Sequence, residues 1–561
     1  MLNRSPRVPL YDRPQPEWTD AERPVLPGSP AAIAHATPLR VAFGLVAVLV
    51  SLAGSLGNAL VTVNLPYIQG SLGLTPSEAA WLSAVYVSAN MTANLVLYKF
   101  RQQFGMRLYA EIGLGLYASL AVLHLAVNNP TTLALLRLGS GFAAATCSTL
   151  GTLYMLQAIP RVWVGNALVV ALGLSQLATP LAWILSPSLL IGGEWHRMYM
   201  FEAGLALCAF AAVVVLKLPR GLHIKVFERR DLLTFALAVP ATVLLCSVIA
   251  QGVTLWWTDT PWLAWALVTA IVLFVTGLLL ELYRDNPLIH MRWLLMPETI
   301  RFGIAAFMLR FLTSEQTYGA VGLLRTLGMG PDQMQPLFVV ILLATLGGIA
   351  LGALTFGPRT MVPQVLTSIV LFALAGWVDQ GQTNLARPEN FYLSQSLVAI
   401  GMGLFMGPLM LMGFQSALKH GPNTVISMIV LVTCSQAMGG LAGSAFFGSY
   451  MTHREHVHST ALTAQITLDE PLVAQRLQLQ QGSYARQSAD AQLSSAQGTT
   501  QLSQAVRREA TVLAYNDVFA LLSQIALGFF ALALWRVWLK ARQLKREAAA
   551  QAGSGPPSPA S

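Results

Sequence analysis

The sequence predicts an all-α polytopic membrane protein with fourteen transmembrane helices. First, only 11% of the 561 residues are charged and 55% are hydrophobic, whereas soluble domains average about one quarter charged residues. Second, apolar stretches of about 20 residues, the length that a helix needs to cross a bilayer, recur along the chain and leave no sizeable soluble domain between them. Third, Lys and Arg residues gather in alternate short loops, as the positive-inside rule requires.

The predicted crossings are bounded by Pro, Gly and charged residues. The first half, 40–216, contains crossings at 40–65, 78–97, 108–127, 132–156, 165–186 and 198–216. Region 217–300 contains a basic cytoplasmic connector, 217–230, and an inserted pair of crossings at 232–252 and 262–281. The second half, 301–545, contains crossings at 301–321, 334–354, 363–378, 391–413, 424–450 and 513–535. The flanking segments 1–39 and 546–561 are predicted to be disordered cytoplasmic tails, since the first is rich in proline and mixed charges.

Loop charge fixes the predicted orientation. If the N-terminus is cytoplasmic, the short cytoplasmic loops carry thirteen Lys and Arg residues and the short outside loops carry three. Both chain ends are then cytoplasmic. The loop 451–512 is outside, because long loops cross the membrane regardless of charge. Its helix-forming composition favours helices that stand off the membrane, interrupted near Gly482 and Gly498, and disorder is the alternative.

The same residues argue against several functions. The net charge of +9 comes from loop residues that form no continuous basic face, so we expect no nucleic-acid binding. No phosphate-binding loop, GxSxG motif or cysteine ligand spacing is present, so we expect neither a cofactor nor an enzyme. His453, His456 and His458 could bind a metal, but only Glu455 lies near them in sequence. A solvated helix end is the simpler interpretation, and we predict no metal site.

Polar residues recur at matching positions in the two halves, which indicates an internal repeat. Arg137 lies near the start of crossing four and Gln157 at its end, and Gln395 and Gln415 lie near the two ends of crossing twelve, so both separations are twenty residues. The next crossing in each half contains a Ser-Gln pair, which ends at Gln176 and at Gln436 respectively. A substrate site between the two halves is therefore expected.

Residues 65–86 read "LPYIQGSLGLTPSEAAWLSAVY". Their Leu-Pro, glycine, Trp81 and Tyr86 positions, with Asn90 beyond, resemble the first-loop signature of the major facilitator superfamily, in the fourteen-span drug:proton antiporter subgroup of EmrB/QacA type. The segment "YNDVFALLSQ", with Asn516 and Phe519, is similar to the opening of that subgroup's last span. The resemblance covers essentially residues 40–545.

The chain also departs from that family pattern. Gly57 stands where the family has an aspartate in span one, with Asn58 beside it. Gln102 stands where aspartate is common in the loop after span two, and Ser140 replaces a glutamine in span four. The usual coupling carboxylate of span one is therefore absent.

The resemblance implies an inner-membrane secondary transporter that exports amphipathic organic compounds, as in multidrug efflux, by proton antiport. It also implies a tripartite pump, in which loop 451–512 would contact a periplasmic membrane-fusion adaptor that joins an outer-membrane channel. One alternative is a dedicated exporter of an endogenous metabolite, such as a siderophore or an organic anion. A second is a membrane sensor or scaffold that does not transport.

Ionisable residues inside spans are costly and usually face a cavity or a partner. For proton coupling we expect Arg137, which resembles the family's arginine, and the acids Glu315 and Glu202. Structural pairing is the alternative for Arg137, and Glu202 could simply touch water. Glu78, at a helix start, is expected to be a cap.

Substrate-binding candidates are polar or aromatic residues expected near the central cavity: Asn58, Asn64, Tyr86, Asn90, Tyr154, Gln176, Arg310, Gln395, Phe405 and Gln436. Arg310 could attract an anionic substrate or form a structural ion pair. Its five-residue separation from Glu315 prevents the two from pairing on one helix face. Interhelical hydrogen bonds are the alternative for Asn58 and Asn64, and interfacial anchoring is the alternative for the aromatic residues.

Overall fold

The computed structural model describes residues 18–19, 22, 24, 28–31, 33–191, 194–222, 226–284, 287–421, 424–466, 470–485 and 491–553. Within these ranges the chain is helical and contains no strand beyond an isolated bridge between Pro30 and Gly221, which confirms the all-α prediction. Thirteen of the described helices are long and apolar enough to cross a membrane. The fourteenth crossing is Pro297–Thr326, an uninterrupted succession of two α-helices joined by a π-helical turn.

The first half contains six crossings. They are α1 (Thr37–Val63), α3 (Pro76–Phe104), α4 (Met106–Leu123), α5 (Pro130–Ala158), the pair α6 (Val164–Leu174) and α7 (Ala178–Leu189), and α8 (His196–Val215). A 3₁₀ turn at Ser175–Leu177 joins α6 to α7. A short helix, α2 (Leu65–Leu72), follows α1 and ends at Gly73, whose φ of 61° is in the left-handed region that favours glycine.

The inserted pair is α9 (Arg229–Gly252) and α10 (Pro261–Leu282), followed by the short helix α11 (Met291–Leu294). The second half begins with α12 (Pro297–Ser314), the π-helical turn Glu315–Ala320 and α13 (Val321–Thr326). It continues with α14 (Pro331–Leu354), α15 (Met361–Val378), α16 (Tyr392–Lys419), α17 (Thr424–Gln465), α18 (Pro471–Ala485) and α19 (Ala491–Gly553).

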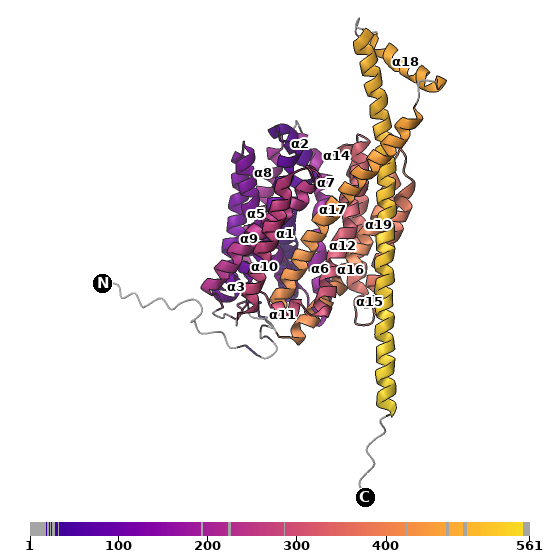
Figure 1. Ribbon diagram of the computed structural model, residues 1–561. Coiled ribbons are helices and arrows are strands. Elements are labelled where there is room, and N and C mark those ends of the chain that lie inside the picture. The colour runs from indigo at the N-terminus through magenta and orange to yellow at the C-terminus, as the bar shows by residue number, and fades with distance from the viewer. Residues whose placement is uncertain are drawn as a thin grey trace, which may run out of the picture.

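The crossings lie side by side in one bundle, with α2 and α18 at one end and α11 with the C-terminal end of α19 at the other (Figure 1). The upper parts of α17 and α19 rise beyond the bundle and carry α18, and we call these residues, 451–512, the stalk. Apart from Ile466 and Glu470, the stalk is helical where it is described. Helix α19 runs through Gly498, so the prediction of a helix interruption at that glycine is wrong. The helix formers on both sides of Gly498 offset the roughly 1 kcal/mol that a glycine costs inside a helix.

Local sequence explains where the helices begin. Proline occupies the first turn of several crossings, where a missing N–H costs no intrahelical hydrogen bond. Glu78 is a cap, as expected. Its Oε2 accepts a hydrogen bond from the Thr75 backbone N–H at 2.8 Å, and the Glu78 N–H donates to Thr75 Oγ1 at 3.3 Å. This reciprocal capping box starts α3.

The predicted disordered tails are shorter in the structure than the sequence suggested. The Gly28 and Ala31 N–H groups donate to the carbonyl oxygens of Leu222 and Arg220 at 3.2 and 3.1 Å, so this part of the N-terminal segment pairs with the connector. At the other end α19 continues to Gly553, because the alanine, lysine and glutamate residues after position 540 are good helix formers. Residues 1–17 and 554–561 lie outside the described residues.

A buried charge network attaches the inserted pair to the first half. Lys99 at the end of α3 contacts Asp231 of α9 at 2.9 Å, and Arg284 after α10 contacts Asp231 and Glu281 at 2.7 Å each. Burial acts to lower the pKa of Arg284, but hydrogen bonds to Asp231, Glu281 and Glu228 outweigh it and raise this pKa above its usual value. Arg284 therefore stays charged and holds the ends of α9 and α10 together.

Candidate functional site

Arg137 is the centre of a polar cluster inside the first half. Its side chain on α5 is 1% exposed. Its Nη2 donates to Asn58 Oδ1 on α1 at 2.6 Å, and its guanidinium lies 4.2 Å from the ring centre of Tyr86 on α3. The helices approach this closely because residue 141 is glycine: a Cβ there would lie 2.3 Å from the Tyr86 carbonyl oxygen. Three predicted site residues on three helices thus meet at one point.

A carboxyl group lies beside this cluster. Glu202 on α8 is 5% exposed, and its Oε1 lies 3.0 Å from Tyr117 Oη on α4. Tyr117 Oη also lies 2.7 Å from the Ala53 carbonyl oxygen on α1. A phenol has one hydrogen to donate and a carbonyl can only accept, so the shorter contact takes that hydrogen. The contact with Glu202 is then a hydrogen bond when the carboxyl group itself is protonated and donates.

The same carboxyl group fills the space next to Gly57. A Cβ at Gly57 would lie 2.1 Å from Glu202 Oε1 and 2.7 Å from Tyr117 Oη. Span one therefore carries no acid at this position, but an acid from span six reaches it. The sequence predicts Glu202 as a coupling residue but does not predict that it lies beside Gly57.

Other predicted residues of the first half contact neighbouring helices. Asn64 is fully buried, donates to the Leu60 carbonyl oxygen at 2.9 Å and accepts from Ser186 on α7. Asn90 donates to the Gly141 carbonyl oxygen at 3.0 Å, close to the Arg137 cluster. Tyr154 donates to the Leu216 carbonyl oxygen at 2.5 Å, beyond the end of α8. The structure therefore gives Asn64 and Tyr154 interhelical partners away from Arg137.

Arg310 lies between the two halves. It is half-buried on α12, and its Nη1 donates to Gln176 Oε1, in the 3₁₀ turn of span five, at 3.2 Å. Glycine at position 439 lets α17 approach α12 here, because a Cβ there would lie 3.2 Å from Arg310 Cβ. Among the residues that the structure describes, no carboxylate forms an ion pair with Arg310. This cation therefore has one neutral amide as its hydrogen-bond partner.

Two further candidates lie in the second half. Gln436 on α17 donates to the sulfur of Met406 on α16 at 3.4 Å. Phe405, which is 1% exposed, belongs to the hydrophobic core that α12, α15, α16 and α19 form together. Its ring is thus enclosed by the second half.

Glu315 and Gln395 meet deep in the second half, with an acid that the sequence did not single out. Gln395 Nε2 on α16 donates to Glu315 Oε1 at 2.9 Å and lies 3.5 Å from Asp379 Oδ2. Asp379 directly follows α15, where the end of an apolar run predicted a loop in water, yet its side chain is fully buried. One feature of the sequence indicates that this region is functional. In the internal repeat, Gln395 occupies the same position in crossing twelve as Arg137 occupies in crossing four.

Of the three histidines near the start of the stalk, His458 takes part in an ion network. Asp517 Oδ2 on α19 lies 2.6 Å from both Arg454 Nε and His458 Nε2 on α17. His453 and His456 are exposed. Over the described ranges, no three His, Cys, Asp or Glu side chains are grouped as they would be to hold a metal ion.

The two halves touch at both ends of their interface. At the stalk end, Arg325 Nη2 donates to the Val63 carbonyl oxygen at 2.7 Å, and its guanidinium lies 5.0 Å from the Trp183 ring centre. At the opposite end, Asn166 Nδ2 on α6 donates to the Ala353 carbonyl oxygen on α14 at 2.5 Å. These contacts join the two halves in the conformation described.

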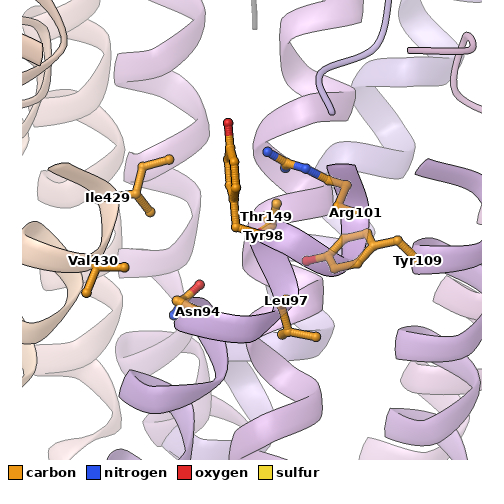
Figure 2. A pocket seen from close by; sticks show the side chains of 8 residues that line it. All are labelled: Asn94, Leu97, Tyr98, Arg101, Tyr109, Thr149, Ile429 and Val430. Atoms are coloured by element: carbon orange, nitrogen blue, oxygen red, sulfur yellow. The ribbon is translucent and has the colours of Figure 1, made fainter. Parts of the chain in front are cut away.

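A small cavity lies between α3, α5 and α17, lined by residues that include Asn94, Arg101, Thr149 and Val430 (Figure 2). Its volume of about 30 Å³ suits one or two water molecules. Organic ligands occupy pockets of about 300–1,000 Å³. This cavity is therefore not a substrate site in the conformation described.

Comparison with known proteins identifies the family. No curated protein matches the chain, but the pattern of the family described as Major Facilitator Superfamily matches residues 46–444, which is more than half of the sequence. The chain belongs to the major facilitator superfamily. The match begins inside α1 and ends inside α17, so it includes the Arg137 cluster, Arg310 and the Glu315 pair.

Solved superfamily structures share this fold. One is the proton:xylose symporter XylE bound to 6-bromo-6-deoxy-D-glucose, with a TM-score of 0.52 and 13% identity over 88% of this chain and 97% of that one. Another is a bacterial homologue of the human drug peptide transporters PepT1 and PepT2, with a TM-score of 0.51 and 12% identity over 90% of this chain and 99% of that one. At such identities the likeness shows the superfamily fold alone.

Within the superfamily fold, eight of the predicted residues form three groups. Arg137, Asn58 and Tyr86 lie with Glu202 in the first half, Arg310 and Gln176 lie between the halves, and Glu315 and Gln395 lie with Asp379 in the second half. The fourteen-span drug:proton antiporter subgroup remains a prediction from the sequence motifs.

Proposed function

We propose that this protein is a secondary transporter that exports amphipathic organic compounds across a bacterial inner membrane in exchange for protons. In this proposal both chain ends are cytoplasmic, and α2 and the stalk face the periplasm. The carrier alternates between inward-open and outward-open states by separating its halves, first at Asn166 and then at Arg325. Multidrug efflux and proton antiport follow from the subgroup resemblance and from the site.

The main support for the proposal is the position of Glu202, which is buried beside Tyr117 and near Arg137. A charged side chain at the centre of a membrane span costs about 2.5–3.5 kcal/mol on insertion scales. Glu202 is buried, with Tyr117 against its carboxyl group and Arg137 close enough to interact with it electrostatically. The carboxyl group can donate to Tyr117 Oη when protonated and can face the Arg137 guanidinium when ionised. It therefore has a stabilising partner in both protonation states, as a proton carrier needs.

Dye transport by the reconstituted full chain tests this proposal. Proteoliposomes are given an imposed pH gradient and either ethidium, an amphipathic cation, or fluorescein, an amphipathic anion. Gradient-dependent movement of at least one dye, lost when a protonophore is added, is the expected result. If neither dye moves and the gradient is unaffected, the chain is better explained as a sensor or scaffold.

Arg310 favours a second candidate function, the export of one endogenous organic anion such as a siderophore. A guanidinium between the halves with one amide partner is suited to bind a carboxylate or phosphate through two parallel hydrogen bonds. In that case Arg310→Gln should lower fluorescein transport about tenfold, equivalent to about 1.4 kcal/mol of lost binding. The same variant should leave ethidium transport within about twofold, because a cation gains nothing from Arg310.

Arg197→Gln is the matched control, since Arg197 is an arginine about half exposed at 49% near the start of α8. Equal loss of both dyes in Arg310→Gln would indicate a structural role for the arginine and remove the support for an anion exporter.

We further propose that the stalk is the contact surface for a periplasmic membrane-fusion adaptor that joins an outer-membrane channel. The stalk projects beyond the bundle (Figure 1), and Leu472 and Leu479 on α18 are 76% and 70% exposed. Leu472→Ser with Leu479→Ser should leave dye transport in proteoliposomes unchanged and lower drug resistance of intact cells. Unchanged resistance would contradict the contact.

A further inference from the structure

An enclosed polar site is formed by Glu315, Asp379 and Gln395. Of these residues, Asp379 is not among the predicted proton-coupling residues. Their side chains are 1%, 0% and 0% exposed. They come from three different segments, the π-helical turn, the residue that follows α15, and the first turns of α16. The single amide nitrogen of Gln395 faces both carboxyl groups, at 2.9 Å from Glu315 Oε1 and 3.5 Å from Asp379 Oδ2. The site is thus two acids bridged by one side chain.

Three oxygen atoms of this site have no hydrogen-bond partner. They are Glu315 Oε2, Asp379 Oδ1 and Gln395 Oε1, all inaccessible to solvent. Oxygen atoms of ionised carboxylates and amides only accept hydrogen bonds, so the site holds surplus acceptors and too few hydrogens. A buried polar group without a partner costs about 1–3 kcal/mol. A proton bound at one of the two carboxyl groups would supply a donor hydrogen and remove one negative charge.

Within the described ranges, no side-chain cation lies within ion-pair distance of Glu315 or Asp379. The titratable or charged side chains on the facing parts of the neighbouring elements are Arg310 on α12, Tyr318 on the π-helical turn, Arg325 on α13, Arg454 and His458 on α17, and Tyr515 and Asp517 on α19. Arg325 donates to the Val63 carbonyl oxygen, and Arg454 and His458 contact Asp517. In the described part of the chain, neither Glu315 nor Asp379 has an ion-pair partner.

We propose that Glu315, Asp379 and Gln395 form one proton-binding site, in which the two carboxyl groups take up and release protons as a unit and Gln395 positions them. This rests on the proposed function and deepens it, because it adds Asp379 to the coupling machinery. Two carboxylates that share one amide in a membrane interior cannot both ionise at low cost. One proton converts an unpartnered carboxylate oxygen into a donor and leaves a single negative charge on the pair. The proton comes from bulk water and returns to bulk water.

The position of the site fits proton entry from the stalk side. Asp379 lies where α15 ends and Gln395 lies where α16 begins, and the next loop residue, Gln382, donates its backbone N–H to Asn516 of α19 at 3.1 Å. The π-helical turn that carries Glu315 is a local departure from α-helical geometry of a kind that is frequent at functional sites. A change in this turn would move Glu315 relative to Asp379.

A pH jump without any organic substrate tests the site directly. Proteoliposomes of the full chain are adsorbed to a solid-supported membrane, and the transient current is recorded after a pH step in sodium-free buffer. All proteins carry Glu202→Gln, so that the buried acid near Arg137 does not contribute. The parent protein should give a current, and Glu315→Gln or Asp379→Asn should each lose most of the displaced charge. The double variant should lose no more than either single one, since the two acids titrate as a pair.

Further variants separate a proton site from a structural one. Gln395→Met keeps the side-chain length and removes the amide, so it should keep the current and shift its pH midpoint by about one unit. Asp332→Asn, which removes an exposed acid at the start of α14, should behave like the parent. Variants that elute as aggregates in size-exclusion chromatography are replaced by Glu315→Asp, which should retain a current with a shifted midpoint.

Other outcomes would overturn the inference. Single variants that each lose about half of the charge, with additive loss in the double variant, would mean two independent acids. A current after a sodium step at constant pH would assign the site to Na⁺ instead of a proton. Because no dye is present, a normal current in a protein that moves no dye would overturn the proposed export and leave the proton site standing.

Discussion

Replacing Arg137 by glutamine is expected to lower the initial rate of pH-driven dye transport about hundredfold, which corresponds to about 2.7 kcal/mol. Glutamine can still bond Asn58, but it removes the cation that lies over Tyr86 and interacts with Glu202. Without that cation the ionised form of Glu202 loses a nearby positive charge, and an uncompensated charge inside a membrane span costs about 2.5–3.5 kcal/mol on insertion scales. The measurement is the initial rate of dye movement in proteoliposomes under a fixed pH gradient.

Arg197→Gln again serves as the control, because it removes the same chemical group from an exposed position and should leave the rate within about twofold. Thermal unfolding followed by tryptophan fluorescence distinguishes lost coupling from lost structure. A rate for Arg137→Gln that stays near the wild-type value would show that the arginine only pairs helices, and it would remove Arg137 from the coupling machinery.

A carboxyl group placed on α1 should restore dye transport to a variant that has lost the carboxyl group of Glu202 on α8. Glu202→Ala is expected to lower pH-driven dye transport about hundredfold, because it removes the carboxyl group that takes up and releases the proton. The alanine also vacates the space beside Gly57, where a Cβ would otherwise lie 2.1 Å from Glu202 Oε1. Glu202→Ala combined with Gly57→Asp should therefore recover transport to within about tenfold of wild type. Initial dye rates of the three proteins decide the outcome.

Gly57→Asp in the wild-type background should be impaired, since its side chain would collide with Glu202 and place two acids together. Gly330→Asp is the control, because a Cβ at Gly330 meets no atom within 4 Å. A double variant as inactive as Glu202→Ala would show that the carboxyl group acts only from α8, or that Glu202 serves the fold. Wild-type transport by Glu202→Ala would exclude it from coupling altogether.

Most of the fold could be predicted from the sequence, because a bilayer permits few solutions. A chain that crosses it must satisfy every backbone N–H and C=O within the crossing segment, so each long apolar run has to be a helix. The predicted crossings correspond to the helices of the structure, including Pro297–Thr326, where Arg310 and Glu315 dilute the apolar pattern. Helix ends were less predictable: α17 and α19 continue far past the membrane because their polar extensions also consist of helix formers.

The candidate site could be predicted only in part. Arg137, Arg310, Glu202 and Glu315 were identifiable because an ionisable residue inside an apolar run needs a partner. Asp379 was not identifiable, because an acid at the end of an apolar run is normally expected to be exposed to water. The sequence does not show that α16 and α19 cover this end of α15. Asn64 looked like a site residue but has its amide partners within the helix packing.

The sequence by itself determined which segments cross the membrane and which of them carry charge, since both are local properties of hydropathy and composition. Only the tertiary structure decided which polar groups meet: Glu202 beside Gly57, Gln176 with Arg310, and Asp379 with Glu315. The physical reason is that helical periodicity fixes where a side chain points relative to its own helix axis. The rotation and depth of one helix against another depend on the side-chain packing of both surfaces, including close approaches such as the one at Gly141.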